Sequence, residues 1–190
     1  MAAAFTEAWL ALTGALRLAR GDPRGLACFD PSIDGFWHSF RAMLLCYPLY
    51  LILLSFPVQL GPPEPIDEFR LFAVESIRFV VAWVAFPLLV LPLVDWLGRG
   101  NRFLGFITVY NWCQVPQTVL FAIVALVGAT GLLSTDAILI CDLVVGLGAL
   151  VYGWYITRVA LALGGGRAAL VILADVALAT LLTHVSMAMY

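Results

Sequence analysis

The chain has 190 residues, of which 63% are hydrophobic and only 12% are charged, and its formal net charge is −2. A soluble domain of this size exposes too much surface for that composition, since ordinary soluble domains carry about 25% charged residues. Disorder needs low hydrophobicity and high charge, and nucleic-acid binding needs a basic surface, so both classes are excluded. The composition therefore predicts an integral membrane protein.

Residues 1–20 form the first predicted element, a helix with two distinct faces. Apolar side chains share one face at helical spacing: Phe5, Trp9, Leu12 and Leu16. Polar side chains share another: Thr6, Thr13, Arg17 and Arg20. The order of these charges does not fit a secretory signal peptide. The pattern predicts an amphipathic helix at the membrane interface, within a cytoplasmic segment over residues 1–35. The alternative is a short helix packed on the protein's own cytoplasmic side.

Five apolar segments are long enough to cross a bilayer, which takes about 20 residues. They cover residues 36–60, 69–97, 103–133, 137–163 and 167–190. Ser32 and Asp34 are suitable caps for the first segment, and Trp37 is a suitable interface anchor. The connections are short, and the one at 61–65 (Gly-Pro-Pro-Glu-Pro) is a rigid turn. An all-α bundle of five antiparallel transmembrane helices over residues 36–190 follows.

Basic residues favour alternate sides of the membrane, and all ten of them are arginine. Those that precede the first span, or lie at the second and fourth connections, are Arg17, Arg20, Arg24, Arg99, Arg102, Arg158 and Arg167. The first connection holds only Arg70 beside three acidic residues, and the third holds no basic residue. The positive-inside rule therefore predicts a multi-pass membrane protein whose N-terminus is in the cytoplasm and whose C-terminus is on the opposite side of the membrane.

Charged side chains inside the spans are costly and should have partners or a hydrated cavity. Glu75 and Arg78 lie three residues apart, so they share one face of the second helix. We expect them to form a local pair that faces the first helix, where Tyr47 and Tyr50 are suitable hydrogen-bonding partners.

The last hairpin carries a second candidate pair. Arg158 and Asp175 flank the turn at 164–166 with an axial offset of about three residues, or roughly 4.5 Å. We expect an ion pair or water-bridged pair that staples the two helices, with a substrate or proton site as the alternative. Asp142 has no evident partner on the neighbouring helix. His184 is expected to be a satisfied side chain near the outer boundary.

The third span contains a row of amides. Asn111, Gln114 and Gln117 recur every three residues, with Pro116 among them. Buried amides can bond to backbone groups freed by a proline or to other helices, which predicts a structural role at a kink. The alternative is a polar lining for the path of a small solute.

Motifs of known enzymes do not occur in the sequence: it has no GxSxG, HExxH, P-loop or Rossmann glycine pattern. His38 and His184 are predicted near opposite faces, and so are Asp142 and Asp175, so neither pair should meet. The cysteines show neither CxxC nor ligand spacing: Cys28, Cys46, Cys113 and Cys141. We therefore expect no enzymatic activity, no metal and no cofactor.

The arrangement resembles the Yip1-domain superfamily, and in particular its small bacterial members. Four segments carry the resemblance: Gly-Asp-Pro at 21–23, Phe-Asp-Pro-Ser-Ile-Asp-Gly-Phe-Trp-His-Ser-Phe at 29–40, Tyr-Asn-Trp at 110–112, and Tyr-Gly-Trp at 152–154 with Arg158. The resemblance implies a cytoplasmic amphipathic segment followed by five short-looped helices, with no catalytic residues. It also implies a location in the bacterial inner membrane, so the C-terminus would be in the periplasm. For eukaryotic relatives it implies roles in membrane trafficking and binding of small GTPases.

Two functions remain open from the sequence. The first is a non-enzymatic scaffold, assembly factor or accessory subunit that acts through contacts with helices and lipids. The second is a transporter or channel subunit for a small solute or ion, which would function as an oligomer. The expected partners are membrane lipids and other membrane subunits or further copies of the chain, and no nucleic acid. If the amide row and Asp175 face one hydrated cavity, transport is favoured.

Overall fold

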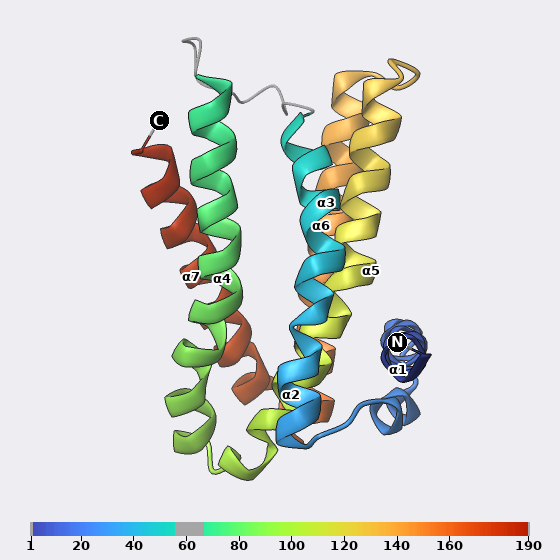
Figure 1. Ribbon diagram of the computed structural model, residues 1–190, viewed down its shortest axis with the longest axis vertical. Coiled ribbons are helices and arrows are strands. Elements are labelled where there is room, and N and C mark those ends of the chain that lie inside the picture. Colours follow the sequence, from blue (N-terminus) through green and yellow to red (C-terminus); the bar gives the residue numbers. More distant parts are fainter. Residues whose placement is uncertain (1, 56–66, 190) are drawn as a thin grey trace.

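The computed structural model describes residues 2–55 and 67–189, and this part of the chain holds seven α-helices, two 3-10 helices and no strand (Figure 1). The α-helices are α1 (Ala2–Ala19), α2 (Ile33–Ser39), α3 (Arg41–Ser55), α4 (Glu68–Trp96), α5 (Phe103–Ala129), α6 (Thr135–Ala160) and α7 (Gly165–Met187). The 3-10 helices are η1 (Pro23–Cys28) and η2 (Gly100–Arg102). The predicted turn at 61–65, the predicted end of the first span at 56–60 and residue 190 lie outside the described residues.

Five helical stretches are long and apolar enough to cross a membrane, as the sequence predicts. They are Ile33–Ser55, which α2 and α3 form together, Glu68–Trp96, Gly100–Ala129, Thr135–Ala160 and Gly165–Met187. α5 and α6 end earlier than the predicted boundaries at 133 and 163. The reason is local, because Gly131 (φ 70°) and Ala162 (φ 48°) take left-handed conformations that a right-handed helix cannot contain.

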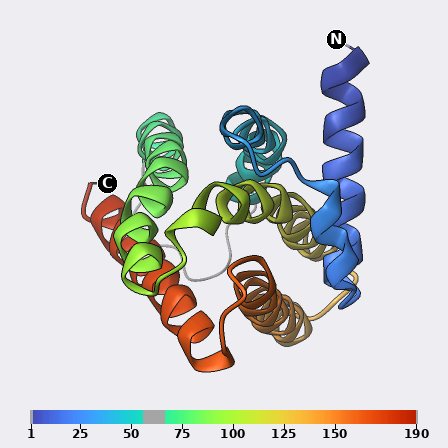
Figure 2. The same ribbon diagram turned by 90° about the horizontal axis from the view of Figure 1, so that it is seen from below.

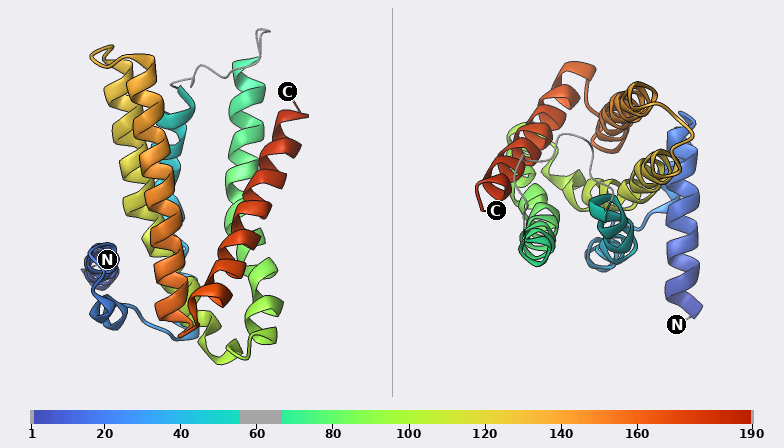
Figure 3. Two further views of the ribbon diagram at one scale, coloured as in Figure 1. Left: turned by 180° about the vertical axis from the view of Figure 1, so that it is seen from behind. Right: turned by 90° about the horizontal axis from the view of Figure 1, so that it is seen from above.

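The long helices form two groups around the central helix α5. α3 and α6 pack against α5, whereas α4 packs mainly against α7. The two groups converge at the end that holds η2 and the α6–α7 turn, and they diverge toward the α5–α6 turn (Figures 1 and 3). One buried cluster around Trp112 joins α1, α3, α5 and α6, and a second around Phe106 joins α4, α5 and α7. The packing therefore leaves space between the groups.

α1 lies across the side of the bundle at a large angle to the long helices (Figures 1 and 2). Its inward face is made of small and aliphatic side chains, and Ala15 and Leu18 are fully buried. The hydroxyls of Tyr152 and Tyr155 on α6 donate to the backbone carbonyls of Ala15 and Gly21 at 2.7 and 2.8 Å. These contacts fix α1 to α5 and α6.

The face of α1 that packs on the protein is not the aromatic face that the sequence singles out. Phe5 and Trp9 are 75% and 67% exposed, Leu16 is exposed, and Leu12 is only half-buried. Small residues allow a closer approach between helices, and a Cβ at Gly14 would lie 2.7 Å from atoms of its neighbours. The aromatic face is therefore left free to meet lipid, and its placement at an interface stays a prediction.

Of the two predicted caps before α2, the structure confirms Ser32, whereas Asp34 lies within the first turn of the helix. The Ser32 hydroxyl accepts the N–H of Gly35 at 3.1 Å, and the Asp30 carboxylate accepts the N–H of Ser32 at 2.9 Å. The hydrogen bonds from Ser32 lower the pKa of Asp30. A Cβ at Gly35 would lie 2.2 Å from the Asp30 carbonyl oxygen, so this turn requires glycine.

Candidate functional site

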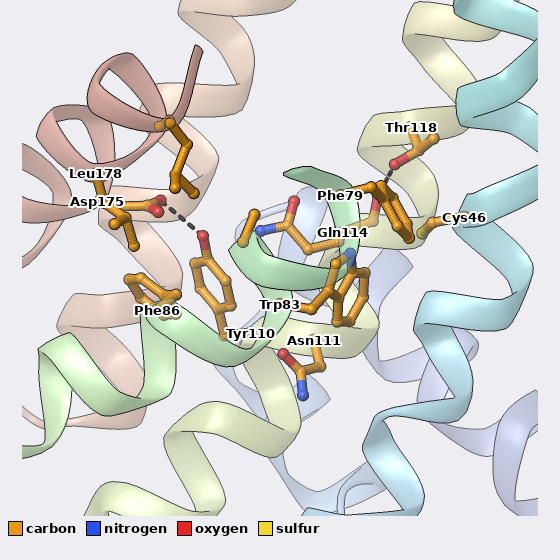
Figure 4. Close-up of a pocket in the computed structure, with 13 residues that line it drawn as sticks. Cys46, Phe79, Trp83, Phe86, Tyr110, Asn111, Gln114, Thr118, Asp175 and Leu178 are labelled. Atoms are coloured by element: carbon orange, nitrogen blue, oxygen red, sulfur yellow. Dashed lines mark hydrogen bonds between the residues drawn. The ribbon is translucent and has the colours of Figure 1, made fainter. Parts of the chain in front are cut away.

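A cavity of about 220 Å³ lies between the two groups of helices (Figure 4). Side chains of α3, α4, α5 and α7 line it: Cys46, Phe79, Ala82, Trp83, Phe86, Tyr110, Asn111, Gln114, Thr118, Asp175, Leu178, Ala179 and Leu182. We call it the Asp175 cavity. Most of this wall is apolar, and Asp175 is the one ionisable carboxylate among these lining residues.

Asp175 and Tyr110 form the polar centre of this cavity. The Tyr110 hydroxyl donates to Oδ2 of Asp175 at 2.6 Å, which joins α5 to α7. The Gln114 amide, one turn above Tyr110 on α5, extends toward the same phenol (Figure 4). Asp175 is the eleventh of the 23 residues of α7, and Gln114 is the twelfth of the 27 residues of α5. The polar centre therefore lies near the middle of both helices.

A second cavity of about 220 Å³ lies on the other side of this polar centre, between α5, α6 and α7. The two cavities share Tyr110, Gln114, Asp175 and Ala179. Gln117 and Gly153 line only the second. The Tyr110–Asp175 hydrogen bond therefore lies between the two cavities.

The prediction that Arg158 pairs with Asp175 is wrong. Arg158 is exposed and lies over the Trp154 ring, with its guanidinium carbon 5.4 Å from the ring centroid. The turn occupies residues 161–164, so Arg158 lies two residues from the end of α6 while Asp175 lies ten residues into α7. That difference of eight residues is about 12 Å along the axes. Trp154 staples the hairpin instead, because its indole N–H donates to the Gly165 carbonyl at 2.9 Å.

The expected Glu75–Arg78 pair is confirmed. Nε of Arg78 donates to Oε2 of Glu75 at 2.7 Å, and Glu75 is buried. The Tyr50 hydroxyl donates to the same carboxylate oxygen and accepts from Arg78 at 2.5 Å. The expected second phenol, Tyr47, bonds to Ser76 at 2.9 Å instead. The charged groups of Glu75 and Arg78 therefore bond to each other and to Tyr50 between α3 and α4, and neither residue lines the Asp175 cavity.

The amide row splits into different roles. Nδ2 of Asn111 donates to the Ser39 hydroxyl at 2.9 Å, so this buried amide ties α5 to α2 as a structural role predicts. Nε2 of Gln117 donates to the Cys113 carbonyl of its own helix at 2.9 Å. Gln114 lines both cavities. Within the amide row, Asn111 thus contributes to helix packing, and Gln114 contributes to the polar lining of the two cavities.

The remaining polar residues of the spans do not join this centre. Nδ1 of His184 lies 2.8 Å from the Thr180 carbonyl on its own helix. Asp142 on α6 is half-buried and has no hydrogen bond or ion pair to any residue in the described ranges 2–55 and 67–189. It lines neither of the two cavities, and it does not meet Asp175, as expected.

Sequence reasoning missed two features of the site. The first is Tyr110, although its spacing of four residues from Gln114 places both on one helix face. The second, outside the Asp175 cavity, is a polar cluster between α1, α2 and α3, where Glu7 lies 3.0 Å from Nδ1 of His38 and 3.2 Å from Arg41. No local spacing indicates the contacts of Glu7, because more than 30 residues separate it from His38 and from Arg41.

Comparison of the chain with family models, curated proteins and solved structures finds no match. Within the described residues, no group of three or more His, Cys, Asp or Glu side chains could hold a metal ion. The geometry of the two cavities is therefore the basis for assigning a function.

Proposed function

We propose that this chain is a non-enzymatic integral membrane protein that binds a small polar solute in the Asp175 cavity, as a transporter or channel subunit does. In this proposal the chain crosses the bacterial inner membrane five times, with its N-terminus in the cytoplasm and its C-terminus in the periplasm. One observation carries the proposal: Asp175, Tyr110 and Gln114 gather around cavities near the middle of helices of spanning length.

The cost of polar groups in hydrocarbon supports this function over a purely structural role. A charge at the bilayer centre costs at least about 2.5–3.5 kcal/mol, so such residues face a cavity or a partner. The Glu75–Arg78 charges neutralise each other, which is the structural solution. Among the residues that the structure describes, only the neutral phenol of Tyr110 donates a hydrogen bond to Asp175, and the second carboxylate oxygen remains to accept a bond from a solute.

Access of water to the cavity tests this function. In a background without native cysteines, Leu182→Cys places a thiol in the wall of the cavity, and Leu181→Cys places one on the outer surface, where Leu181 is 60% exposed. Only a thiolate reacts with a methanethiosulfonate, and thiolates form in water rather than in lipid. In membrane vesicles we expect the charged reagent MTSET to modify Leu182→Cys at least tenfold faster than Leu181→Cys. Equal rates at the two positions would contradict the proposal.

Lipid headgroups are the proposed partner of α1. The helix lies across the bundle axis with Phe5 and Trp9 exposed, the orientation that an interfacial helix takes (Figure 2). Arg17 and Arg20 are exposed, as the attraction of anionic lipid requires. Trp9→Ser should increase the accessibility of α1 to proteolysis in vesicles that contain anionic lipid, and an unchanged cleavage rate would contradict the interfacial placement.

A second candidate function is a Yip1-like scaffold or assembly factor, acting with other subunits or with further copies of the chain. The outer face of α6 favours it: Gly146 and Gly148 have open space above them, and Leu143 and Val144 are both 62% exposed. Glycines on such a face allow another helix to approach closely. Gly148→Leu should dissociate an oligomer or complex in cross-linking experiments if this surface is used, and unchanged cross-linking would argue against it.

A further inference from the structure

The lining of the Asp175 cavity indicates the chemical class of its solute. Four aromatic side chains contribute to the wall: Phe79, Trp83, Phe86 and Tyr110. Figure 4 shows Tyr110 and Phe86 gathered near Asp175, with Trp83 and Phe79 toward the α3 side of the cavity. No basic side chain is among the lining residues of either cavity described above.

The carboxylate of Asp175 at the centre of this wall favours a positively charged ligand. Within the described parts of the chain Asp175 has no ion pair, and Arg158 is directed to Trp154 instead. The Tyr110 hydroxyl donates a hydrogen bond to Oδ2 of Asp175, and Oδ1 can accept a further hydrogen bond from a ligand. An anion would be repelled here, and a neutral solute would leave the carboxylate without a counter-charge.

The aromatic wall favours an organic cation over an inorganic one. Calcium takes six to eight oxygen ligands, whereas this cavity offers one carboxylate, one phenol, one hydroxyl and two amides among mostly apolar side chains. A substituted ammonium has little hydration to lose and is attracted to aromatic ring faces. A volume of about 220 Å³ is below the range of roughly 300–1,000 Å³ that is typical of sites for drug-sized ligands.

We infer that the Asp175 cavity binds a small organic monovalent cation of the substituted-ammonium type, with Asp175 as counter-ion and the aromatic side chains around it as the wall. This inference rests on the proposed function, since it names the solute class of the same cavity. Trp83 contributes the largest ring to the wall, and Tyr110 positions the carboxylate by its hydrogen bond.

Choline and its neutral isostere 3,3-dimethylbutan-1-ol are suitable probes, because they have nearly the same shape and differ in charge. In the full-length chain that carries Leu182→Cys, choline should slow modification by MTSET at least fivefold, and the neutral isostere should not. This protection assay leaves Asp175 intact, so it does not depend on the folding of an Asp175 variant. If MTSET reacts with Leu182→Cys but choline gives no more protection than the isostere, the cation inference is wrong while the proposed function stands.

Direct binding of choline to the purified protein by calorimetry provides the second test. Asp175→Asn should weaken binding at least tenfold, and Trp83→Leu should weaken it about 2- to 30-fold, as expected for the loss of one cation–π contact. Asp142→Asn is the matched control, because Asp142 is a carboxylate of the spans that lines neither cavity, and it should leave binding unchanged. Equal weakening by Asp142→Asn and Asp175→Asn would overturn the assignment.

Discussion

Replacing Arg78 by methionine should destabilise the protein more than any change to its exposed ion pairs. The side chains of Glu75 and Arg78 are 5% and 23% exposed, and the two groups meet at 2.7 Å. Arg78→Met removes the guanidinium that bonds to the Glu75 carboxylate, whereas the Tyr50 hydroxyl, a neutral donor, still bonds to it. Breaking a buried pair on one side costs about 3–5 kcal/mol, and the partial exposure of Arg78 places the expected loss near 3 kcal/mol.

Removing both charges together should cost much less than removing one. In Glu75→Gln/Arg78→Met no uncompensated charge remains, so we expect a loss of about 1 kcal/mol and a coupling energy of at least about 2 kcal/mol. Equilibrium unfolding in mixed detergent micelles, followed by helical circular dichroism, measures each variant. A double variant as unstable as Arg78→Met would refute the reasoning, and so would a loss below about 1 kcal/mol for Arg78→Met alone.

Three further predictions concern single contacts and use the same unfolding measurement. Gly35→Ala places a Cβ 2.2 Å from the Asp30 carbonyl oxygen and should lower the free energy of unfolding by about 1–3 kcal/mol. Gly146→Ala places a Cβ in open space and should be neutral or stabilise the protein by up to about 1 kcal/mol. A larger loss for Gly146→Ala than for Gly35→Ala would be incompatible with the packing. Thr157→Val should stabilise the protein by about 1 kcal/mol, because its buried hydroxyl has no hydrogen-bond partner in the described residues, and a loss of stability would show that the hydroxyl is bonded. Glu7→Gln should cost no more than about 1 kcal/mol, since the side chains of Glu7, His38 and Arg41 are 32–42% exposed to solvent. A loss above about 2 kcal/mol would contradict this expectation.

Features of the sequence that act within one helix were predictable. Long apolar runs predicted the five helices of spanning length, because hydrocarbon thickness fixes the number of residues that a crossing needs. The Glu75–Arg78 pair followed from a spacing of three residues, which holds on any α-helix whatever its neighbours. The Ser32 cap followed from the chemistry of a helix N-terminus.

Features that depend on how helices rotate against each other were not predictable. Tyr110 and Asp175 are 65 residues apart, and their contact exists only because α5 and α7 turn those faces together. The expected pairing of Arg158 with Asp175 failed because the turn was centred near Gly165, whereas Gly165 is the first residue of α7 and the turn occupies residues 161–164. A shift of a few residues in a helix end moves an axial position by several ångströms, which is enough to break an ion pair.

The choice of packing face on α1 was hidden for a different reason. Phe5 and Trp9 are the largest apolar side chains of the helix, yet Ala15 and Leu18 pack on the bundle. In a membrane protein a large apolar side chain can be satisfied by lipid as well as by protein, so hydrophobicity does not decide which face meets the bundle. Small residues decide it here, because they let α1 approach α5 and η1 closely.

The claim on which the whole account depends is that the chain crosses a membrane five times, so that consecutive helix ends lie in opposite compartments. Single cysteines at Arg20, Asn101, Leu132 and Met187, in a background without native cysteines, report the side of each helix end to an impermeant maleimide in sealed vesicles. The account predicts labelling of positions 20 and 101 from the cytoplasmic side only, and of positions 132 and 187 from the opposite side only. Labelling of positions 20 and 187 from the same side would contradict it.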